Sequence, residues 1–322
     1  MTRATLLSLT KPTSAPAAPA SPAGDKAAAH PDAESGFVAV DASAPQVNLM
    51  DLGLTRGDGV FETISVVNGH AQALEPHLQR LAHSAALLDL PEPDLDVWRR
   101  AVLAGVERYG LENETALEND SRPENGTAPE LYAKLILTRG VEGTRQPSGW
   151  VFVDEAEDFS AARRGIRVVT LDRGYRHDVA ETSPWLLQGA KTLSYAANRA
   201  ALREAARRDA NDVIFVSADG FALEGPTSNV IVRNGDTVRT PQTDQGILAG
   251  TTQAGVFEFF EQRGFATSYE RITADELRSA DALWLVSSVR QAAPVSDLDG
   301  KPFDVDAAIT DDLNAFLLAR TV

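Results

Sequence analysis

Apolar residues recur at every third or fourth position in three stretches of the chain. This spacing places them on one face of a helix and predicts amphipathic helices over residues 74–90, 95–109 and 307–318. Short apolar or alternating runs bounded by turn residues predict β-strands. The expected strands cover residues 36–41, 59–69, 131–138, 150–153, 166–171, 213–216, 221–223, 230–232 and 282–287. Because helices and strands intermix without a regular βαβ repeat, the pattern favours an α+β arrangement of two subdomains.

Two segments lack any apolar period. Residues 1–35 are rich in Ala, Pro and Ser, so a disordered tail is expected there. Residues 112–129 are polar and acidic, which predicts a surface insertion. The rest of the chain is expected to form a smaller first subdomain over 36–153, a connection over 154–164 and a larger second subdomain over 165–322.

Composition excludes several classes of protein. The chain of 322 residues has 30 Lys+Arg against 46 Asp+Glu, a formal net charge of −16, which argues against binding nucleic-acid phosphates or an anionic membrane. It contains no cysteine and no His-x-x-x-His pair, so no disulfide, thiolate nucleophile or metal site is expected. No apolar run approaches the roughly 18 residues that span a bilayer. The first residues also lack the apolar core of a signal peptide, so a cytoplasmic protein is expected.

Lys191 is the lysine best placed for covalent chemistry. Of five lysines, two lie in the tail, Lys134 lies within a strand and Lys301 lies in a Gly-Lys-Pro turn. Lys191 precedes a predicted helix with one apolar face, formed by Leu193, Ala197 and Ala200. A partly desolvated lysine at the junction of a loop and a helix has a lowered pKa and attacks carbonyl groups. On spacing alone, a solvated surface lysine is the favoured interpretation.

Hydroxyl groups gather at two positions in the second half of the chain. Thr251 and Thr252 follow Gly250 and open an apolar helix, where free backbone N–H groups and the helix dipole favour a phosphate. A plain threonine N-cap has the same local sequence. Ser287 and Ser288 end an apolar strand and add hydroxyls to such a phosphate cradle, although ordinary strand-end serines look the same.

Four charged side chains are further candidates. Glu224 ends a predicted strand, where its carboxylate either holds a protonated ring nitrogen or caps neighbouring amides. Arg80 lies on the apolar turn of a helix, from which it either reaches an anion or extends to solvent. Arg139 and Arg145, at and beyond the end of a buried strand, either bind a substrate carboxylate or remain solvated.

The order and spacing of these segments resemble the class IV pyridoxal-phosphate-dependent aminotransferases, the family of the D-amino-acid and branched-chain enzymes. The resemblance covers about residues 40–320. It rests on Gly-Asp-Gly-Val-Phe-Glu-Thr at 57–63, Pro-His-Leu-Gln-Arg-Leu at 76–81, the Lys191 segment, Glu224 with a following Ser-Asn, and Gly-Thr-Thr at 250–252. It implies two α/β subdomains with pyridoxal 5'-phosphate in the cleft between them, in a homodimer whose partner completes the pocket.

The resemblance also implies roles for single residues. Lys191 matches the lysine that binds the cofactor covalently and moves the proton, and Glu224 matches the acid that faces the pyridine nitrogen. The cofactor phosphate is expected at Arg80, Thr251, Thr252, Ser287 and Ser288. Tyr195 aligns with the tyrosine that bonds the cofactor's phenolic oxygen in branched-chain enzymes. Phe61 and Thr63 fall on the substrate side.

The residues around Lys191 and Arg139 favour one reaction within the family. Branched-chain enzymes usually show Lys-Ala-Gly-Gly-Asn-Tyr, whereas this chain has Lys-Thr-Leu-Ser-Tyr, one residue shorter. The pattern Arg-Gly-x-x-Gly-x-Arg from Arg139 to Arg145 is similar to that of aminodeoxychorismate lyases. The resemblance therefore favours 4-amino-4-deoxychorismate lyase, which forms 4-aminobenzoate and pyruvate for folate synthesis, with both arginines on the small-molecule substrate's carboxylates. The alternatives are a D-amino-acid or branched-chain aminotransferase and, after these, a non-catalytic binding protein of the same fold.

Overall fold

The chain forms two compact units in a computed structural model, which describes residues 4–14, 35–119 and 129–321. The first unit extends to Ala156 and also includes the short segment Lys191–Ser194. The second comprises Glu157–Ala190 and Tyr195–Arg320. The expectation that 165–322 form one continuous subdomain is therefore wrong for Lys191–Ser194, the segment that carries the candidate lysine.

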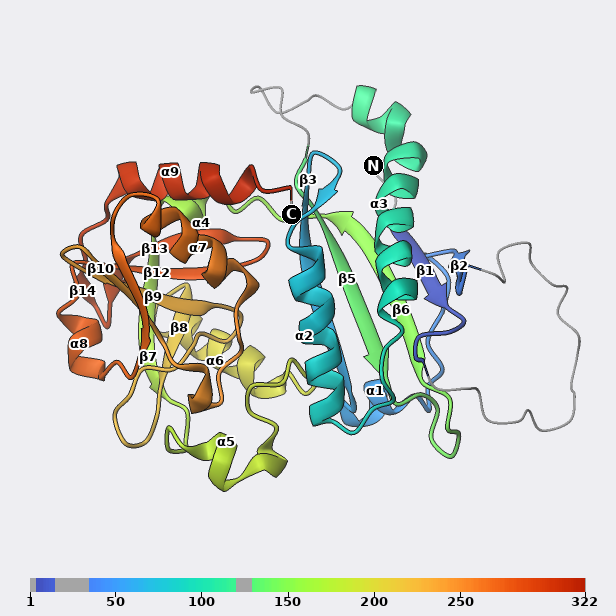
Figure 1. The fold of residues 1–322 in the computed structure, drawn as a ribbon, viewed down its shortest axis with the longest axis horizontal. Coiled ribbons are helices and arrows are strands. Elements are labelled where there is room, and N and C mark those ends of the chain that lie inside the picture. The colour runs from blue at the N-terminus through green and yellow to red at the C-terminus, as the bar shows by residue number, and fades with distance from the viewer. Residues whose placement is uncertain (1–3, 15–34, 120–128, 322) are drawn as a thin grey trace, which may run out of the picture. The chain divides into compact units, whose positions relative to one another are not determined.

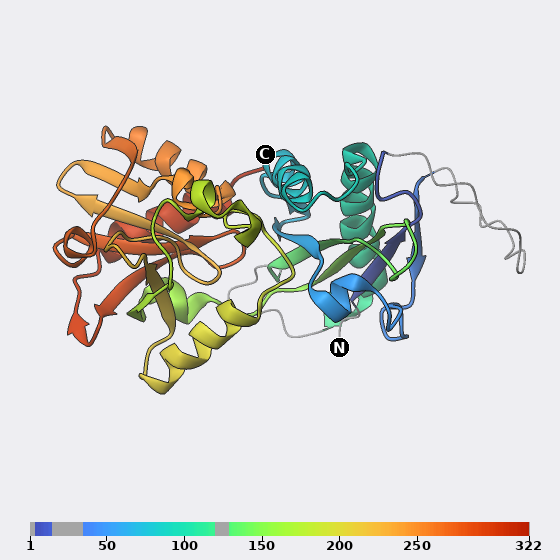
Figure 2. The ribbon, with the colours of Figure 1, turned by 90° about the horizontal axis from the view of Figure 1, so that it is seen from below.

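The first unit is built on a six-stranded antiparallel sheet with the order β2-β1-β6-β5-β3-β4 (Figure 1). Its strands are β1 (Thr5–Leu9), β2 (Phe37–Val40), β3 (Gly59–Val67), β4 (His70–Ala71), β5 (Leu131–Thr138) and β6 (Ser148–Glu155). Its helices are α1 (Leu52–Arg56), α2 (Leu74–Leu87) and α3 (Leu95–Asn119). Successive side chains of a strand point to opposite faces. Helices α2 and α3 lie on one side of the sheet (Figure 2) and bury the face that carries Val60, Ile64, Leu135 and Val151.

Residues 5–9, expected to lie in a disordered tail, form strand β1. It pairs with β2 on one side and β6 on the other, inside the sheet. Thr5, Leu7 and Leu9 alternate inward, and Leu7 is only 2 % exposed. Three inward positions are too few to stand out beside the Ala- and Pro-rich sequence that follows. Residues 1–3 and 15–34 of the predicted tail lie outside the described residues.

Helix α3 also runs beyond its predicted end at residue 109 and reaches Asn119. The predicted insertion over 112–129 thus begins inside a helix. Glu112 accepts hydrogen bonds from the Thr5 hydroxyl at 2.8 Å and from Arg108 Nε at 2.6 Å. Glu112 is therefore tied to α3 and to β1, which composition alone does not reveal. Residues 120–128 of this prediction lie outside the described residues.

The second unit is built on an eight-stranded mixed sheet with the order β11-β10-β9-β12-β13-β7-β8, and β14 pairs with β13. Its strands are β7 (Ile166–Asp172), β8 (Asp212–Val216), β9 (Asn229–Asn234), β10 (Thr237–Pro241), β11 (Ala266–Glu270), β12 (Ala282–Ser287), β13 (Gln291–Leu298) and β14 (Lys301–Pro302). Its helices are α4 (Ser160–Arg164), α5 (Val179–Thr182), α6 (Ala196–Arg207), α7 (Thr251–Glu261), α8 (Ala274–Arg278) and α9 (Ala307–Leu318).

Apolar residues from both faces of the second sheet are buried. Helices α7 and α9 pack on one face through a cluster that includes Val256, Phe260, Trp284 and Leu313. Helix α6 packs on Val213 of β8 and its neighbours. Within the described residues, no helix is long and apolar enough to cross a membrane.

Candidate active site

Lys191 lies in an extended segment along the open edge of β3. Its carbonyl accepts a hydrogen bond from the Phe61 N–H at 3.0 Å, and its own N–H donates to Ser84 Oγ at 3.1 Å. The Leu193 N–H donates to the Gly59 carbonyl at 2.8 Å. Three hydrogen bonds thus hold the backbone around Lys191 to the first unit.

The predicted helix after Lys191 begins only at Ala196, as α6. Its buried residues are Ala201 and Ala205, so the expected apolar face of Leu193, Ala197 and Ala200 is wrong. The backbone N–H and carbonyl groups of residues 191–193 pair with β3 instead of starting a helix. This pairing depends on a strand more than 120 residues earlier in the chain. The local spacing of apolar residues contains no information about such a distant partner.

The Lys191 side chain reaches over Phe61, with Nζ 4.6 Å from the centroid of the phenyl ring. Phe61 and Thr63 are alternate residues of β3 and share a face of the sheet. Lys301 is exposed in β14, and Lys134 lies in the middle of β5. Lys191 is half-buried beside an aromatic ring, the surroundings expected of a reactive lysine.

Arg80 is held by a buried carboxylate. Its Nε donates to Glu62 Oε1 and its Nη2 donates to Glu62 Oε2, both at 2.7 Å. His77 Nδ1 lies 2.7 Å from the same Oε2. Arg80 therefore points inward, and its partner Glu62 is a residue that sequence reasoning did not single out. The signal was present, because Glu62 lies within the same Phe-Glu-Thr motif as Phe61.

Arg139 does not have the surroundings expected of a substrate-binding residue. Its guanidinium bonds both carboxylate oxygens of Asp58, at 2.6 and 3.2 Å, and the carbonyls of Leu88 and Asp89, at 2.6 and 3.1 Å. These bonds tie the end of β5 to the loops before β3 and after α2. Arg145 is exposed in the loop beyond β5. The hydrogen bonds of Arg139 are thus with Asp58 and two backbone carbonyls, and within the described residues they include no partner shared with Arg145.

In the second unit, Glu224 is tied to the segment that leads into α7. Its Oε2 accepts a hydrogen bond from the Leu248 N–H at 3.0 Å, and Asn229 Nδ2 donates to the Leu248 carbonyl at 2.8 Å. Gly250 follows two residues later, and a Cβ atom there would lie 2.1 Å from Asn229 Oδ1. Only glycine fits this close approach. The carboxylate and the start of α7 are thus linked through one short loop.

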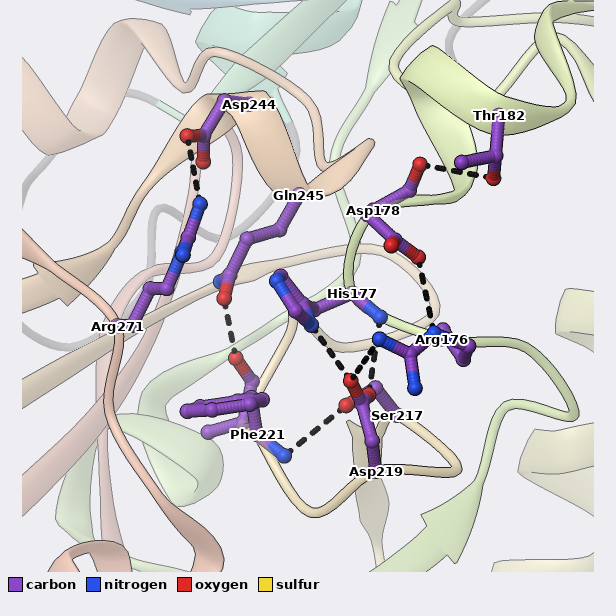
Figure 3. Close-up of polar contacts among 11 residues, drawn as sticks. Arg176, His177, Asp178, Thr182, Ser217, Asp219, Phe221, Asp244, Gln245 and Arg271 are labelled. Atoms are coloured by element: carbon purple, nitrogen blue, oxygen red, sulfur yellow. Dashed lines mark hydrogen bonds and ion pairs between the residues drawn. The ribbon is translucent and has the colours of Figure 1, made fainter.

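The turn that leads to Glu224 is pinned by polar contacts (Figure 3). Asp219 accepts a hydrogen bond from the His177 backbone N–H at 3.0 Å, and its carboxylate lies 2.6 Å from His177 Nδ1. The Phe221 N–H donates to Ser217 Oγ at 2.9 Å. These bonds hold residues 217–221 on both sides and so restrict the position of Glu224.

Tyr195 lies at the start of α6, also in the second unit. Its hydroxyl donates a hydrogen bond to the Pro226 carbonyl at 2.5 Å. Burial raises the pKa of the Tyr195 phenol, and the charge of Glu224 raises it further. Tyr195 is therefore protonated at neutral pH and lies within the electrostatic reach of Glu224.

Two of the residues predicted to hold the phosphate, Thr251 and Ser288, meet at the N-terminus of α7. Thr251 is the first residue of this helix, and its Oγ1 lies 3.3 Å from Ser288 Oγ, just beyond β12. Thr252 is buried, and Ser287 is the last residue of β12, in register with Gln291 of β13. Two hydroxyl groups and the positive end of an 11-residue helix thus meet at one place.

The first unit carries a lysine beside an aromatic ring. The second unit carries a carboxylate linked to a helix N-terminus with two hydroxyl groups. Residues 59–298 match the model of the amino-transferase class IV family. The chain therefore belongs to the class IV aminotransferase family.

The chain is similar to several known proteins of this family. A bifunctional aminodeoxychorismate lyase / D-amino acid transaminase of Mycobacterium tuberculosis is 42 % identical over 288 residues, covering 83 % of this chain and 95 % of that protein. The structure of the fold IV-transaminase CpuTA1 from Curtobacterium pusillum is 68 % identical, with a TM-score of 0.88 over 99 % of each chain. A hypothetical aminotransferase from M. tuberculosis in its PLP-bound form is 40 % identical, with a TM-score of 0.80 over 88 % of this chain and 96 % of that one.

The fold is that of the fold type IV enzymes, with two half-barrel subdomains, and the cofactor is pyridoxal 5'-phosphate. The residues present fit this group. The hydroxyls and N–H groups at the start of α7 suit its phosphate, Glu224 suits its ring nitrogen, and Lys191 suits its aldehyde. The expected family, fold and cofactor are thereby confirmed, and the chain is a class IV enzyme, a lyase, an aminotransferase or both.

Replacing Glu224 with glutamine tests the assigned ring-nitrogen partner. Glutamine keeps an oxygen that accepts the Leu248 N–H but removes the negative charge that favours a protonated ring nitrogen. We expect the cofactor to remain bound and turnover to fall about 100-fold. Absorbance of the bound cofactor and steady-state rates measure the two effects, and near-native turnover would remove Glu224 from the site.

Proposed function

We propose that this chain is a 4-amino-4-deoxychorismate lyase that also transaminates D-amino acids. The observation that carries the proposal is the position of Lys191, an amine held over Phe61 by a backbone that three hydrogen bonds fix. The 42 % identical relative, described as carrying both activities, supports the same pair of reactions here. Both reactions begin with removal of a proton from the carbon that bears the substrate amine, so one base serves both.

The roles of the residues follow from their chemistry. When bound, pyridoxal phosphate supplies an electron sink for the carbon that loses its proton. Lys191 Nζ removes that proton, and Glu224 keeps the ring nitrogen protonated. In the lyase reaction the C–O bond to the side chain would then break, the ring would become aromatic, and the released enolpyruvate would take up a proton to become pyruvate. In transamination Lys191 would return the proton to a different carbon, water would supply the oxygen of the released 2-oxo acid, and the amino group would pass by way of the cofactor to a second 2-oxo acid. Arg80, Thr251, Thr252, Ser287 and Ser288 hold the phosphate.

One assay on the purified holoenzyme tests the proposal. Pyruvate release from 4-amino-4-deoxychorismate measures the lyase, and 2-oxo-acid-dependent loss of the amine from D-alanine measures the transaminase. We expect both. Transamination of D-alanine without release of pyruvate from 4-amino-4-deoxychorismate would show that the protein is an aminotransferase and not a lyase. Preference for leucine as the amino donor would favour the branched-chain alternative. Inactivity of a cofactor-loaded protein toward all three would favour a binding protein of the same fold.

Lys134 is the better candidate for a substrate carboxylate than Arg139. Lys134 pairs directly with Thr63 across β3 and β5, so the two side chains share the face of the sheet that carries Phe61. Arg139 instead bonds Asp58 and two backbone carbonyls. We propose that Lys134 binds a carboxylate of the substrate from the sheet face on which Lys191 Nζ lies.

A matched pair of methionine variants separates these two cations. We expect Lys134→Met to lower kcat/KM about tenfold or more, because a charge-assisted hydrogen bond contributes about 1.5–3 kcal/mol. Its cofactor content and melting temperature should stay unchanged. Arg139→Met should instead lower the melting temperature and spare kcat/KM per folded enzyme. A lower kcat/KM in Arg139→Met and an unchanged kcat/KM in Lys134→Met would instead assign the substrate carboxylate to Arg139.

We also propose that the partner of this chain is a second copy. Exposed apolar side chains gather before and within α1, where Leu49 is 76 % and Leu54 59 % exposed. Tyr132, Trp150 and Phe152 are partly exposed on the sheet face opposite α2 and α3. Sedimentation equilibrium tests this: a particle of 34.5 kDa, one chain, would contradict it. The cytoplasmic location and the role in folate synthesis stay predictions.

A further inference from the structure

A buried cluster of three polar residues, Glu62, His77 and Arg80, joins β3 to α2. Their side chains are 0 %, 1 % and 9 % exposed. Arg80 meets Glu62 in a two-pronged arrangement, Nε to Oε1 and Nη2 to Oε2, each at 2.7 Å. This geometry fixes the plane of the guanidinium as well as its distance. Replacing a buried ion pair by apolar packing often leaves stability unchanged or raises it, so the cluster needs a reason beyond folding.

The charge of the cluster follows from its contacts. Burial raises the pKa of the Glu62 carboxyl, but the charge and hydrogen bonds of Arg80, with help from His77, lower it to about 2. Burial lowers the pKa of His77 despite the bond to Glu62, and the charges of Arg80 and Lys191 lower it further. Glu62 is thus ionised and His77 neutral at pH 7. An ionised carboxylate only accepts, so His77 Nδ1 carries the proton and donates it.

The same face of α2 also holds the candidate lysine. His77, Arg80 and Ser84 lie three and four residues apart, on one side of the helix. Ser84 Oγ accepts the Lys191 N–H, while Arg80 meets Glu62, the strand neighbour of Phe61. Displacement of Glu62 would therefore disturb the direction of Arg80 next to the segment that carries Lys191.

We propose that Glu62 is a positioning residue, which sets the direction in which Arg80 presents its N–H groups to the cofactor phosphate. The inference rests on the phosphate role of Arg80 in the proposed function. His77 holds the second oxygen of Glu62 through its Nδ1–H, so that the carboxylate keeps its orientation without a second cation. The alternative is a purely structural cluster that fastens α2 to β3.

A pair of ligands distinguishes the two. Pyridoxal 5'-phosphate and pyridoxal share the ring and the aldehyde and differ in the phosphate, so an effect through Arg80 appears with the first ligand alone. Dissociation constants are measured by absorption titration of the apo-protein with each ligand. The variants are Glu62→Gln, which replaces one acceptor oxygen by an N–H donor facing Arg80 or His77, and Arg80→Met.

The control is Glu75→Gln on the same helix. Glu75 also meets an arginine through two bonds, to Arg99 Nε at 2.5 Å and Nη2 at 2.8 Å, but this pair lies at the surface. We expect Glu62→Gln and Arg80→Met each to weaken binding of pyridoxal 5'-phosphate about tenfold or more and that of pyridoxal less than about twofold. Glu75→Gln should change neither.

Three results would overturn the proposal. Equal loss of both ligands in Glu62→Gln would show a structural role, as would unchanged binding of pyridoxal 5'-phosphate. If Arg80→Met bound pyridoxal 5'-phosphate as tightly as the wild type, Glu62 could not act on the phosphate through Arg80. No substrate enters these titrations, so failure of the lyase or transaminase assignment leaves their outcome intact.

Discussion

Lys191→Ala is expected to lose the covalent link to the cofactor and at least about a thousandfold in turnover. Lys191 supplies both the amine that bonds the cofactor aldehyde and the base that carries the proton, and one substitution removes both. Its Nζ lies 4.6 Å from the centre of the Phe61 ring, and alanine has neither the amine nor the reach to take its place. Borohydride reduction followed by peptide mass spectrometry locates the link, and steady-state rates measure the loss.

Lys301→Ala is the matched control for this experiment. Lys301 is exposed in β14, so its variant should keep the reducible link and native turnover. A cofactor fixed by borohydride to another lysine in Lys191→Ala would contradict the assignment, and Lys134 would then be the first residue to examine.

Removal of residues 1–9 is expected to prevent stable folding of the first unit. The truncation removes β1 from between β2 and β6, which leaves two strands without partners on one side and uncovers part of the core under α3. The milder variant Leu7→Ala should cost about 2–5 kcal/mol, because Leu7 is buried in this core. Chemical denaturation followed by circular dichroism measures both effects.

Ser8→Ala controls for the point variant, because Ser8 points to the opposite face of β1 and is only partly buried. Its free energy of unfolding should stay within about 0.5 kcal/mol of the wild type. A truncated protein with native stability and activity would contradict the structural role of β1 and would agree with the disordered tail expected from composition.

Local sequence was sufficient where a long apolar period or a short motif carries its own physical cause. The helix predicted over 307–318 is confirmed as α9, and the one predicted over 74–90 is confirmed as α2. Helix α7 begins at Thr251, directly after the glycine, as expected. The order of the motifs also identified the family and the cofactor, because class IV chemistry requires a lysine, a ring-nitrogen acid and a phosphate cradle together.

Contacts between residues far apart in the chain decided the rest. Arg139 is locked by Asp58, and Arg80 is directed by Glu62; in each case the sequence shows the arginine but not which carboxylate it meets. Lys191 pairs with the edge of β3 because that edge offers unpaired N–H and carbonyl groups, a condition that exists only once the sheet has formed. Residues 5–9 become a strand for the same reason, since two neighbouring strands supply partners that five residues cannot supply alone. The sequence by itself therefore determined which chemical groups the protein carries. The tertiary structure decided which of these groups form hydrogen bonds and ion pairs with one another, because the partners lie far apart in the chain.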